Sequence, residues 1–202
     1  KKQQTMGVTI SRAHVDYYNK KRRRANRGSV LLVGLDGAGK STIAYQLALG
    51  KHVDTLPTMG HNKQTMTHWG RKWDLFDVGG SMLIRETWRL YARAADGIIY
   101  VVDSSDTNRM AEAGAALRTL YMGDGQSSEH HGAKSAVLNI PLLVLANKQD
   151  RPNAVPYTKV EKRMDIKAMP VKKLCLPSNG KTGESLNAGV MWLTEQIDEM
   201  SG

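Results

Sequence analysis

The segment Gly34-Leu-Asp-Gly-Ala-Gly-Lys40-Ser41 decides the fold of this chain. It fits the phosphate-binding P-loop pattern, in which a glycine, four further residues and Gly-Lys-Ser follow a strand and open a helix. The apolar run 29–33 precedes it, and the helix-forming stretch 41–50 follows it. In that setting the glycines let backbone N–H groups close on a polyphosphate, and the helix N-terminus adds favourable partial charge. The segment therefore predicts a phosphate site at the end of a strand.

Each residue type in this segment has its own expected role in nucleotide binding. Lys40 is expected to reach the β- and γ-phosphates of a nucleotide, and the Ser41 hydroxyl to ligate Mg²⁺. The other nucleotide contacts are expected from Gly34, Asp36, Gly37, Ala38, Gly39 and Thr42. By itself the pattern names neither the nucleotide nor the reaction, so the rest of the chain has to supply both.

The size and composition of the chain suit one domain. Its 202 residues, 41% of them apolar, are enough for a single full core. No run approaches the roughly 18 consecutive apolar residues of a membrane span, and no secretory signal is expected. Cys175 is the one cysteine and stands in an apolar run, so we expect it to be buried in a protein of a reducing, cytoplasmic compartment.

The positive charge is concentrated at the N-terminal end. Residues 1–29 carry nine Lys or Arg and one acid, Asp16, so +8 of the formal net charge of +10 belongs to them. We therefore divide the chain into a basic N-terminal arm, residues 1–28, and a near-neutral domain, residues 29–202. The arm suits contact with an anionic membrane surface, or it is a solvated tail whose charge serves solubility, and both readings stay open. No nucleic-acid partner is expected.

Strand-like and helix-like stretches alternate beyond the arm. Strands are predicted over 30–35, 97–103, 141–146 and 171–176, with a hairpin over 65–77 that turns at Gly70-Arg71; helices are predicted over 41–50, 107–121 and 186–200. This order favours an α/β fold whose sheet is mostly parallel and binds ligands at the carboxyl ends of its strands. Residues 123–135 are predicted to form an exposed loop. His130-His131 in that loop could bind a metal ion, but adjacent side chains do not easily share one ion, and a plain loop is preferred.

Two further segments match what a Mg²⁺–nucleotide site requires. In Pro57-Thr-Met-Gly60, Thr58 can give its hydroxyl to Mg²⁺ and its backbone N–H to a γ-phosphate, although alone the segment would be read as a simple loop. In Asp77-Val-Gly-Gly80, the carboxylate at a strand end can hold Mg²⁺, usually through water, and the Gly80 N–H can reach the γ-phosphate. The value of both segments lies in their order and spacing.

Two later segments predict a site for guanine. Asn147-Lys-Gln-Asp150 directly follows an apolar strand, and the Asp150 carboxylate can accept from the guanine N1–H and exocyclic amine together. Adenine offers no such donor pair, so it would leave polar groups unpaired. Asn147 would tie loops together and contact the base, while the stem of Lys148 covers the face of the base. In Asn179-Gly180-Lys181 a backbone N–H can reach the guanine O6.

Taken in order, these five segments resemble the guanine-nucleotide motifs of Ras-type small GTPases. Within that group the chain resembles the Arf and Arf-like branch, over about residues 29–200. The signatures of the branch appear over residues 34–42, 56–60, 73–80, 84–88 with Tyr91, 101–106 and 183–193. Local likenesses at 109–113 and in the closing helix are similar to ciliary Arf-like members.

This resemblance implies a Ras-like P-loop GTPase domain with a six-stranded, mostly parallel sheet flanked by helices on both faces. GTP and GDP would be the ligands, with Mg²⁺ held by Ser41, Thr58 and Asp77. The hydrolytic residues would be Lys40, Thr58, Gly80 and Ser81. The implied partners are a guanine-nucleotide exchange factor, a GTPase-activating protein and effectors, which meet the switch segments 51–60 and 79–91. We expect a monomeric, cytoplasmic protein that associates peripherally with membranes in trafficking.

Several positions depart from the pattern of the family. Ser81 stands where the family usually has a glutamine that orients the attacking water, so intrinsic hydrolysis of GTP should be slow. His61 replaces a usual Phe and Phe76 a common Trp, in the hairpin whose sliding couples nucleotide state to the N-terminus in the family. The segment between Asp103 and Asn147 is longer than usual, with the insertion expected at 123–135.

The N-terminal residues also depart from the family, whose members commonly begin Met-Gly and carry myristate. Here Met6-Gly-Val-Thr-Ile-Ser11 fits the acylation pattern, so Gly7 would be the acceptor if residues 1–5 are absent from the mature protein. A single acyl chain needs a second signal, which Lys20–Arg24 could supply. Arf-like members without myristate are the alternative.

Two function classes follow from these observations. The first is a GTP-hydrolysing molecular switch, and the second is a GTP-binding interaction module that hydrolyses little, with Ser81 as its signature. A P-loop nucleotide kinase fits poorly, because Asp150 and the Thr58–Asp77 pair would have no purpose in it. The resemblance to the family implies that Arg85 and Arg89 stand at exposed helix positions that meet partners, rather than serving as an arginine finger in cis.

Overall fold

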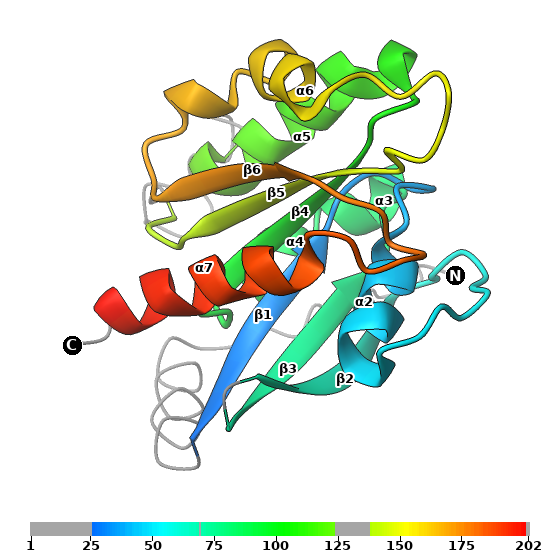
Figure 1. Cartoon of the computed structure of the whole chain (residues 1–202). Coiled ribbons are helices and arrows are strands. Elements are labelled where there is room, and N and C mark those ends of the chain that lie inside the picture. Colours follow the sequence, from blue (N-terminus) through cyan, green and yellow to red (C-terminus); the bar gives the residue numbers. More distant parts are fainter. Residues whose placement is uncertain (1–25, 69, 124–137, 201–202) are drawn as a thin grey trace, which may run out of the picture.

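A six-stranded sheet forms the centre of the computed structural model, which describes residues 26–68, 70–123 and 138–200 (Figure 1). The strands are β1 Arg27–Val33, β2 His61–His68, β3 Arg71–Val78, β4 Gly97–Asp103, β5 Leu142–Asn147 and β6 Lys173–Pro177. Their order is β2-β3-β1-β4-β5-β6. All neighbouring strands pair in parallel except β2, which pairs antiparallel with β3 at one edge. The predicted six-stranded, mostly parallel sheet is confirmed.

Helices cover both faces of this sheet, as the sequence predicted. They are α2 Lys40–Leu49, α3 Met82–Arg85, α4 Trp88–Ala92, α5 Met110–Met122, α6 Tyr157–Arg163 and α7 Leu186–Glu199, with single 3₁₀ turns η1 Thr107–Arg109 and η2 Ile166–Ala168. Figure 1 shows α5 and α6 on one face and α2 and α7 on the other. The layers are therefore helix, sheet and helix.

The core consists of two apolar clusters, one on each side of the sheet. Leu31 of β1 packs on the side of α4, α5 and α6, where Trp88 and Leu117 are fully buried. Leu32, the next residue, packs on the side of α2 and α7 with Ile43 and Leu193. A strand that is buried on both faces needs apolar residues at every position, which is why β1 reads as a continuous apolar run.

The strand boundaries differ from the prediction at several ends. β1 begins at Arg27 instead of 30 and ends at Val33, so Arg27 and Gly28, assigned by the sequence to the arm, pair with β3. The hairpin is longer than 65–77, because His61 already pairs with Val78. The first residues of β2 are polar and mostly exposed, and an edge strand of this kind carries no apolar alternation to predict it. β6 begins at Lys173 rather than at 171.

The residue pattern did not predict the three short helices α3, α4 and α6, because four to seven residues give too little periodicity to recognise. Only the family resemblance implied helix positions at Arg85 and Arg89. The predicted helix 107–121 divides into η1 and α5. Cys175 is buried as predicted, and burial raises the pKa of its thiol to about 12. In the described part of the chain no helix combines the length and apolar character needed to cross a membrane.

Some predicted features lie outside the described residues. They are residues 1–25 of the arm with Gly7 and Lys20–Arg24, and residues 124–135 of the expected insertion with His130-His131.

Candidate nucleotide site

The P-loop joins the end of β1 to the start of α2 at the carboxyl edge of the sheet. Gly34 has φ +142° and faces the Val101 carbonyl of β4, which a Cβ at this position would overlap. Gly39 precedes α2 with φ +94°, a conformation that L side chains rarely adopt. These two glycines therefore let the loop turn tightly over the sheet and open α2, which is what close approach of a polyphosphate to backbone N–H groups requires.

Lys40, the first residue of α2, is buried in this loop. Its side chain folds back so that Nζ donates to the Leu35 carbonyl at 3.0 Å, and only 6% of the residue is exposed. Burial lowers the pKa of Lys40 to about 8, against the opposing effect of the Asp77 and Asp36 carboxylates. A desolvated cation of this kind is stabilised by an anion beside it, so the position suits the predicted phosphate contact.

Three oxygen-bearing side chains from distant segments meet next to Lys40. The Ser41 hydroxyl donates to Asp77 Oδ2 at 2.5 Å and lies 2.8 Å from the Thr58 hydroxyl, which itself donates to Asp77 Oδ2 at 3.4 Å. Asp77 Oδ1 is buried and has no hydrogen-bond partner in the described part of the chain. Burial raises the pKa of Asp77, although Ser41 and Lys40 act in the opposite direction.

This corner fits a magnesium ion. Mg²⁺ prefers hard oxygen ligands and is usually bound by one or two side chains, with water and substrate phosphates completing the octahedron. The unpaired Oδ1 of a buried carboxylate and the two adjacent hydroxyls offer such oxygens. The described segments hold no cluster of three or more His, Cys, Asp or Glu.

Gly79 and Gly80 follow β3 and lie directly against the P-loop. A Cβ on Gly80 would overlap the Asp36 N–H and the Gly34 carbonyl, so the glycine is required by this contact. The Gly79 N–H donates to the Gly60 carbonyl at 2.8 Å, which joins this turn to the end of the segment that contains Thr58. The P-loop, residues 55–60, Gly80 and Ser81 line one open pocket of about 840 Å³.

The residues predicted to read a base gather beside the P-loop. The Asn147 amide donates from Nδ2 to the Ala38 carbonyl at 2.9 Å, and Oδ1 accepts from the Gly180 N–H at 2.9 Å. Asn147 therefore ties together the P-loop, its own loop and the 179–181 segment, as predicted. A pocket of about 80 Å³ lies here, lined by Gly39, Thr42, Asn147, Lys148, Asp150, Arg151, Asn179, Gly180 and Lys181. Asp150 is exposed toward it.

The comparisons agree with this arrangement. The sequence profile of the ADP-ribosylation factor family matches residues 15–197. The chain belongs to the ADP-ribosylation factor family. As an Arf-family protein it is a small GTPase that binds guanine nucleotide, which confirms the resemblance and the fold class predicted from the sequence.

Solved structures of this fold are also similar to the chain. The small GTPase Arl6 BBS3 from Trypanosoma brucei, with bound nucleotide analogue GppNp, has 26% sequence identity and a TM-score of 0.72; the match covers 86% of this chain and 98% of that one. The mammalian SRP receptor has 17% identity and a TM-score of 0.66, with 82% of this chain and 98% of that chain covered. The second likeness is one of fold alone.

The positions that depart from the Arf family pattern have defined surroundings. Ser81 is exposed and precedes α3, and its side chain makes no capping hydrogen bond to that helix. His61, at the start of β2, lies with Nδ1 2.9 Å from the Tyr91 hydroxyl of α4, and the two rings are 5.3 Å apart. The replacement of an apolar ring by His61 therefore leaves a polar contact between the hairpin and the second switch segment.

The expectation that Arg85 and Arg89 stand at exposed positions is wrong. The Arg85 side chain is only 15% exposed and pairs with Glu112 of α5 at 2.6 Å. Arg89 donates to the Thr119 and Leu120 carbonyls at 3.3 and 3.1 Å. Both arginines point toward α5, which offers the Glu112 carboxylate near its start and the Thr119 and Leu120 carbonyls near its end. The family resemblance by itself did not identify this packing partner.

Two site residues were missed by the sequence reasoning. Arg109 makes two contacts with the Asp36 carboxylate in the P-loop, at 3.1 and 3.2 Å. Asp103, at the end of β4, pairs with Lys148 at 2.7 Å. Burial opposes ionisation of Asp103, but the Lys148 and Ser105 hydrogen bonds hold its pKa below the usual value. The sequence could have identified Asp103, because an acid at the end of a predicted strand is expected at the carboxyl edge of the sheet, where ligands bind. Nothing in the sequence indicated the contact of Arg109 with the P-loop.

Proposed function

We propose that this Arf-family protein is a Mg²⁺-dependent switch that cycles between GDP and GTP forms. The observation that carries the proposal is the convergence of Ser41, Thr58 and Asp77 within one hydrogen-bonded corner beside the buried Lys40. Thr58 belongs to a segment that is otherwise largely exposed, and Gly80 follows β3 at the P-loop. A γ-phosphate that contacts both segments would order them, and its loss would release them.

The residues of the chain have distinct roles in this proposal. Lys40 neutralises the β- and γ-phosphates, and backbone N–H groups of residues 34–42 surround them. Ser41 would ligate Mg²⁺ in both nucleotide states, Thr58 would ligate it in the GTP state, and Asp77 would hold it through water. The ion would supply positive charge that stabilises the negative charge of the phosphates.

Guanine specificity rests on Asp150 in this proposal. Its carboxylate, exposed toward the small pocket beside Asn147, accepts from the guanine N1–H and amine. A backbone N–H of the Asn179-Gly180-Lys181 segment meets the O6, and the stem of Lys148 covers the base. Lys148 has φ +64° and is anchored by Nζ to the Gly37 carbonyl at 2.6 Å, so its stem crosses beside the phosphate loop.

Hydrolysis of GTP is proposed to be slow. Positioning of the attacking water and stabilisation of γ-phosphate charge are the two contributions that such a site makes. Lys40, Mg²⁺ and the Gly80 N–H would stabilise the charge on the γ-phosphate. The attacking water is not positioned in the same way, because the Ser81 side chain is too short to hold it as a glutamine would. A GTPase-activating protein would add the missing group. The alternative, a GTP-binding interaction module with little or no hydrolysis, is favoured by the same Ser81 observation.

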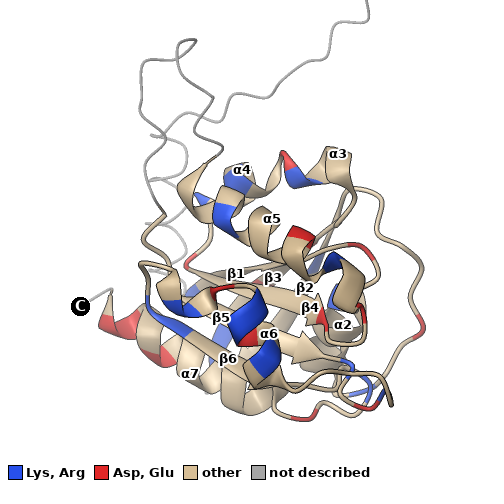
Figure 2. Ribbon diagram, turned by 90° about the horizontal axis from the view of Figure 1, so that it is seen from above, with Lys and Arg blue, Asp and Glu red and all other residues tan. Residues whose placement is uncertain are grey.

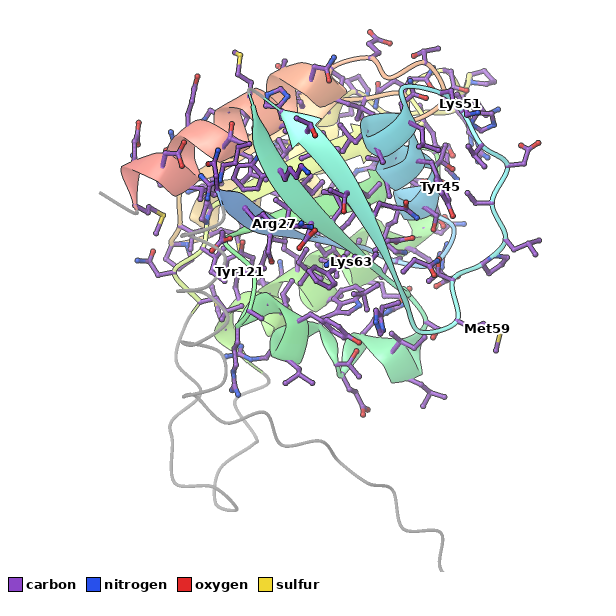
Figure 3. All side chains as sticks on the ribbon, turned by 90° about the horizontal axis from the view of Figure 1, so that it is seen from below. Arg27, Tyr45, Lys51, Met59, Lys63 and Tyr121 are labelled. Carbon is purple, nitrogen blue, oxygen red and sulfur yellow. The ribbon has the colours of Figure 1, made fainter. Side chains whose placement is uncertain are left out.

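The switch segments expose a surface suited to partner proteins. Large apolar side chains are strongly exposed in both of them: Leu56 87%, Met59 96%, Met82 75% and Leu83 83%. Figure 3 shows Met59 pointing away from the body of the protein. Exposed apolar groups of this kind mark interaction sites. We propose that effectors, an exchange factor and an activating protein bind here, in trafficking, while the basic arm contacts an anionic membrane surface and the domain stays monomeric.

The test is nucleotide binding by the purified full chain. We expect fluorescent GDP and GTP analogues to bind tightly with Mg²⁺ and to be released by EDTA, and excess GTP, but not ATP, to compete. Single-turnover hydrolysis with and without an activating protein separates the switch from the interaction module. Competition by ATP equal to that by GTP, or binding that is indifferent to EDTA, would overturn the proposal.

A further inference from the structure

Arg85 joins three separate parts of the nucleotide site. Its Nε donates to the Gly80 carbonyl at 2.7 Å, and its Nη1 donates to Glu112 of α5 at 2.6 Å. Its Nη2 faces the Asp36 carboxylate of the P-loop at 3.5 Å. Figure 2 shows α3 and α4 beside α5, with basic positions on the first two and an acidic one on the third. One guanidinium thus contacts the second switch segment, the P-loop and α5.

The chain fixes both peptide groups on either side of Gly80. The Trp88 indole N–H donates to the Gly79 carbonyl at 2.9 Å, and Arg85 donates to the Gly80 carbonyl. Because a trans peptide is planar, the direction of a carbonyl sets the direction of the N–H of the next residue. Trp88 therefore orients the Gly80 N–H, and Arg85 orients the Ser81 N–H. Gly80 and Ser81 both line the open pocket beside the P-loop.

Asp36, one of the partners of Arg85, is itself held in place by Arg109. Arg109 makes two contacts with the Asp36 carboxylate and is paired with Asp106 at 2.6 Å. The Arg85 side chain is 15% exposed, whereas its partners Glu112 and Asp36 are 39% and 56% exposed, so solvent still reaches both ion pairs from the carboxylate side. A planar guanidinium can donate to two acceptors at once in a fixed geometry, which a lysine ammonium cannot reproduce.

We infer that Arg85 is a positioning residue for recognition of the γ-phosphate. It holds the Gly80–Ser81 peptide and thereby fixes Gly80, whose N–H is the one that the proposed function assigns to the γ-phosphate. Its fork connects that peptide to Glu112 of α5, so the guanidinium acts through the backbone rather than on the nucleotide. This inference rests on the proposed function, in which the site distinguishes GTP from GDP. It names Arg85 as one cause of that distinction. A nucleoside diphosphate lacks the γ-phosphate and does not depend on this peptide.

The test measures affinities for GDP and for a non-hydrolysable GTP analogue at fixed Mg²⁺, using the wild-type full chain, three test variants and one control variant. Arg85→Ala should lower the analogue-to-GDP affinity ratio by about tenfold, as expected for loss of a charge-assisted hydrogen bond. Arg85→Lys should lower the ratio almost as far, because the charge remains but the fork is lost. Glu112→Gln, which keeps an acceptor of the same shape, should lower the ratio in the same direction but less.

Arg89→Ala is the matched control. Arg89 also joins the second switch segment to α5 but donates to carbonyls of α5 and not to Gly80. We expect its ratio to equal that of the wild type. An Arg89→Ala effect as large as that of Arg85→Ala would show that general docking of the segment matters, and would overturn the inference. A wild-type ratio in Arg85→Lys would overturn it too, because charge alone would then suffice.

A purely structural role gives a different result. If Arg85 only stabilised the fold, Arg85→Ala would weaken both nucleotides equally and lower the melting temperature of the GDP form, and Glu112→Gln would leave the ratio unchanged. That pattern would overturn the inference. Failure of the proposed function is seen separately, as a wild-type protein that does not bind guanine nucleotides in a Mg²⁺-dependent way.

Discussion

The Ser41 hydroxyl donates a hydrogen bond of 2.5 Å to Asp77 Oδ2, although the two residues are 36 positions apart. Ser41 belongs to the first turn of α2, and Asp77 lies near the end of β3. Parallel pairing of β1 with β3 brings the carboxyl end of β3 beside the P-loop that follows β1. The second carboxylate oxygen of Asp77 is left buried without a partner within the described segments.

Replacement of Asp77 tests the proposed metal corner. Asp77→Asn keeps the shape of the side chain but removes its charge, so we expect the affinity of the GDP-bound protein for Mg²⁺ to fall by about 10- to 100-fold. The measurement is the Mg²⁺ dependence of GDP dissociation. Asp74→Asn on the same strand is the matched control, because Asp74 is paired with Arg27 and Lys63 away from the P-loop. Equal Mg²⁺ dependence in Asp77→Asn and wild type would contradict the assignment.

Replacement of Asp150 tests the reading of the base. In Asp150→Asn one acceptor oxygen becomes a donor, so guanine loses affinity by roughly 10- to 100-fold and xanthine nucleotides gain. Competition between GDP and xanthosine diphosphate measures the shift. Asp165→Asn serves as the control, since Asp165 has φ +55°, which Asn tolerates, and lies outside the pocket. Unchanged guanine preference in Asp150→Asn would remove Asp150 from the base site.

Replacement of Ser81 tests the cause of slow hydrolysis. Ser81→Gln supplies a side chain long enough to hold the attacking water, so we expect single-turnover hydrolysis to accelerate by roughly tenfold to a hundredfold, most clearly with an activating protein. The Ser81 side chain caps no helix, so the change removes no capping hydrogen bond. Met82→Gln, at the adjacent exposed position, should leave the rate measured without an activating protein unchanged. If wild type is as fast as Ser81→Gln under both conditions, another group orients the water.

The lowered pKa of Lys40 predicts a pH dependence of nucleotide binding. Burial holds this pKa at about 8 in the free protein, and a bound phosphate raises it, because an adjacent anion favours the charged ammonium. Binding therefore takes up protons above about pH 8, and affinity falls as the pH rises, by at most about tenfold per pH unit. Calorimetry between pH 7 and 9 in buffers of different ionisation enthalpy measures the uptake.

Lys40→Arg is the control for that measurement. Arginine stays charged throughout this range, so the proton uptake should disappear in the variant. Persistent uptake would assign the proton to another group.

Removal of residues 1–25 tests the arm. The cut spares Arg27, which pairs with Asp74 and begins β1, so nucleotide affinity should be unchanged. We expect co-sedimentation with anionic vesicles at low salt to be lost, because most of the excess positive charge is removed. Vesicles of neutral lipid are the control. Equal binding of the full and shortened chains to anionic vesicles would identify the arm as a solvated tail.

The sequence by itself determined the order of the main elements, the sheet type and the five nucleotide motifs. These depend on local residue types, such as the glycines before Lys40 and the apolar run of β1, which are read within a few positions. Its errors lie where local signals are weak: the polar start of β2 at His61 and the short helices α3, α4 and α6.

Only the tertiary structure decided which side chains meet. Asn147 bonds to Ala38 across 109 positions, and Arg109 to Asp36 across 73, because strand pairing and helix packing bring together segments that the sequence keeps apart. The same packing buries most of the Arg85 side chain, which was expected to be exposed, and lets it bond to both Gly80 and Glu112. The family resemblance implied an exposed position for Arg85, but the partner of a side chain depends on the neighbouring element, and here α5 supplies the carboxylate of Glu112.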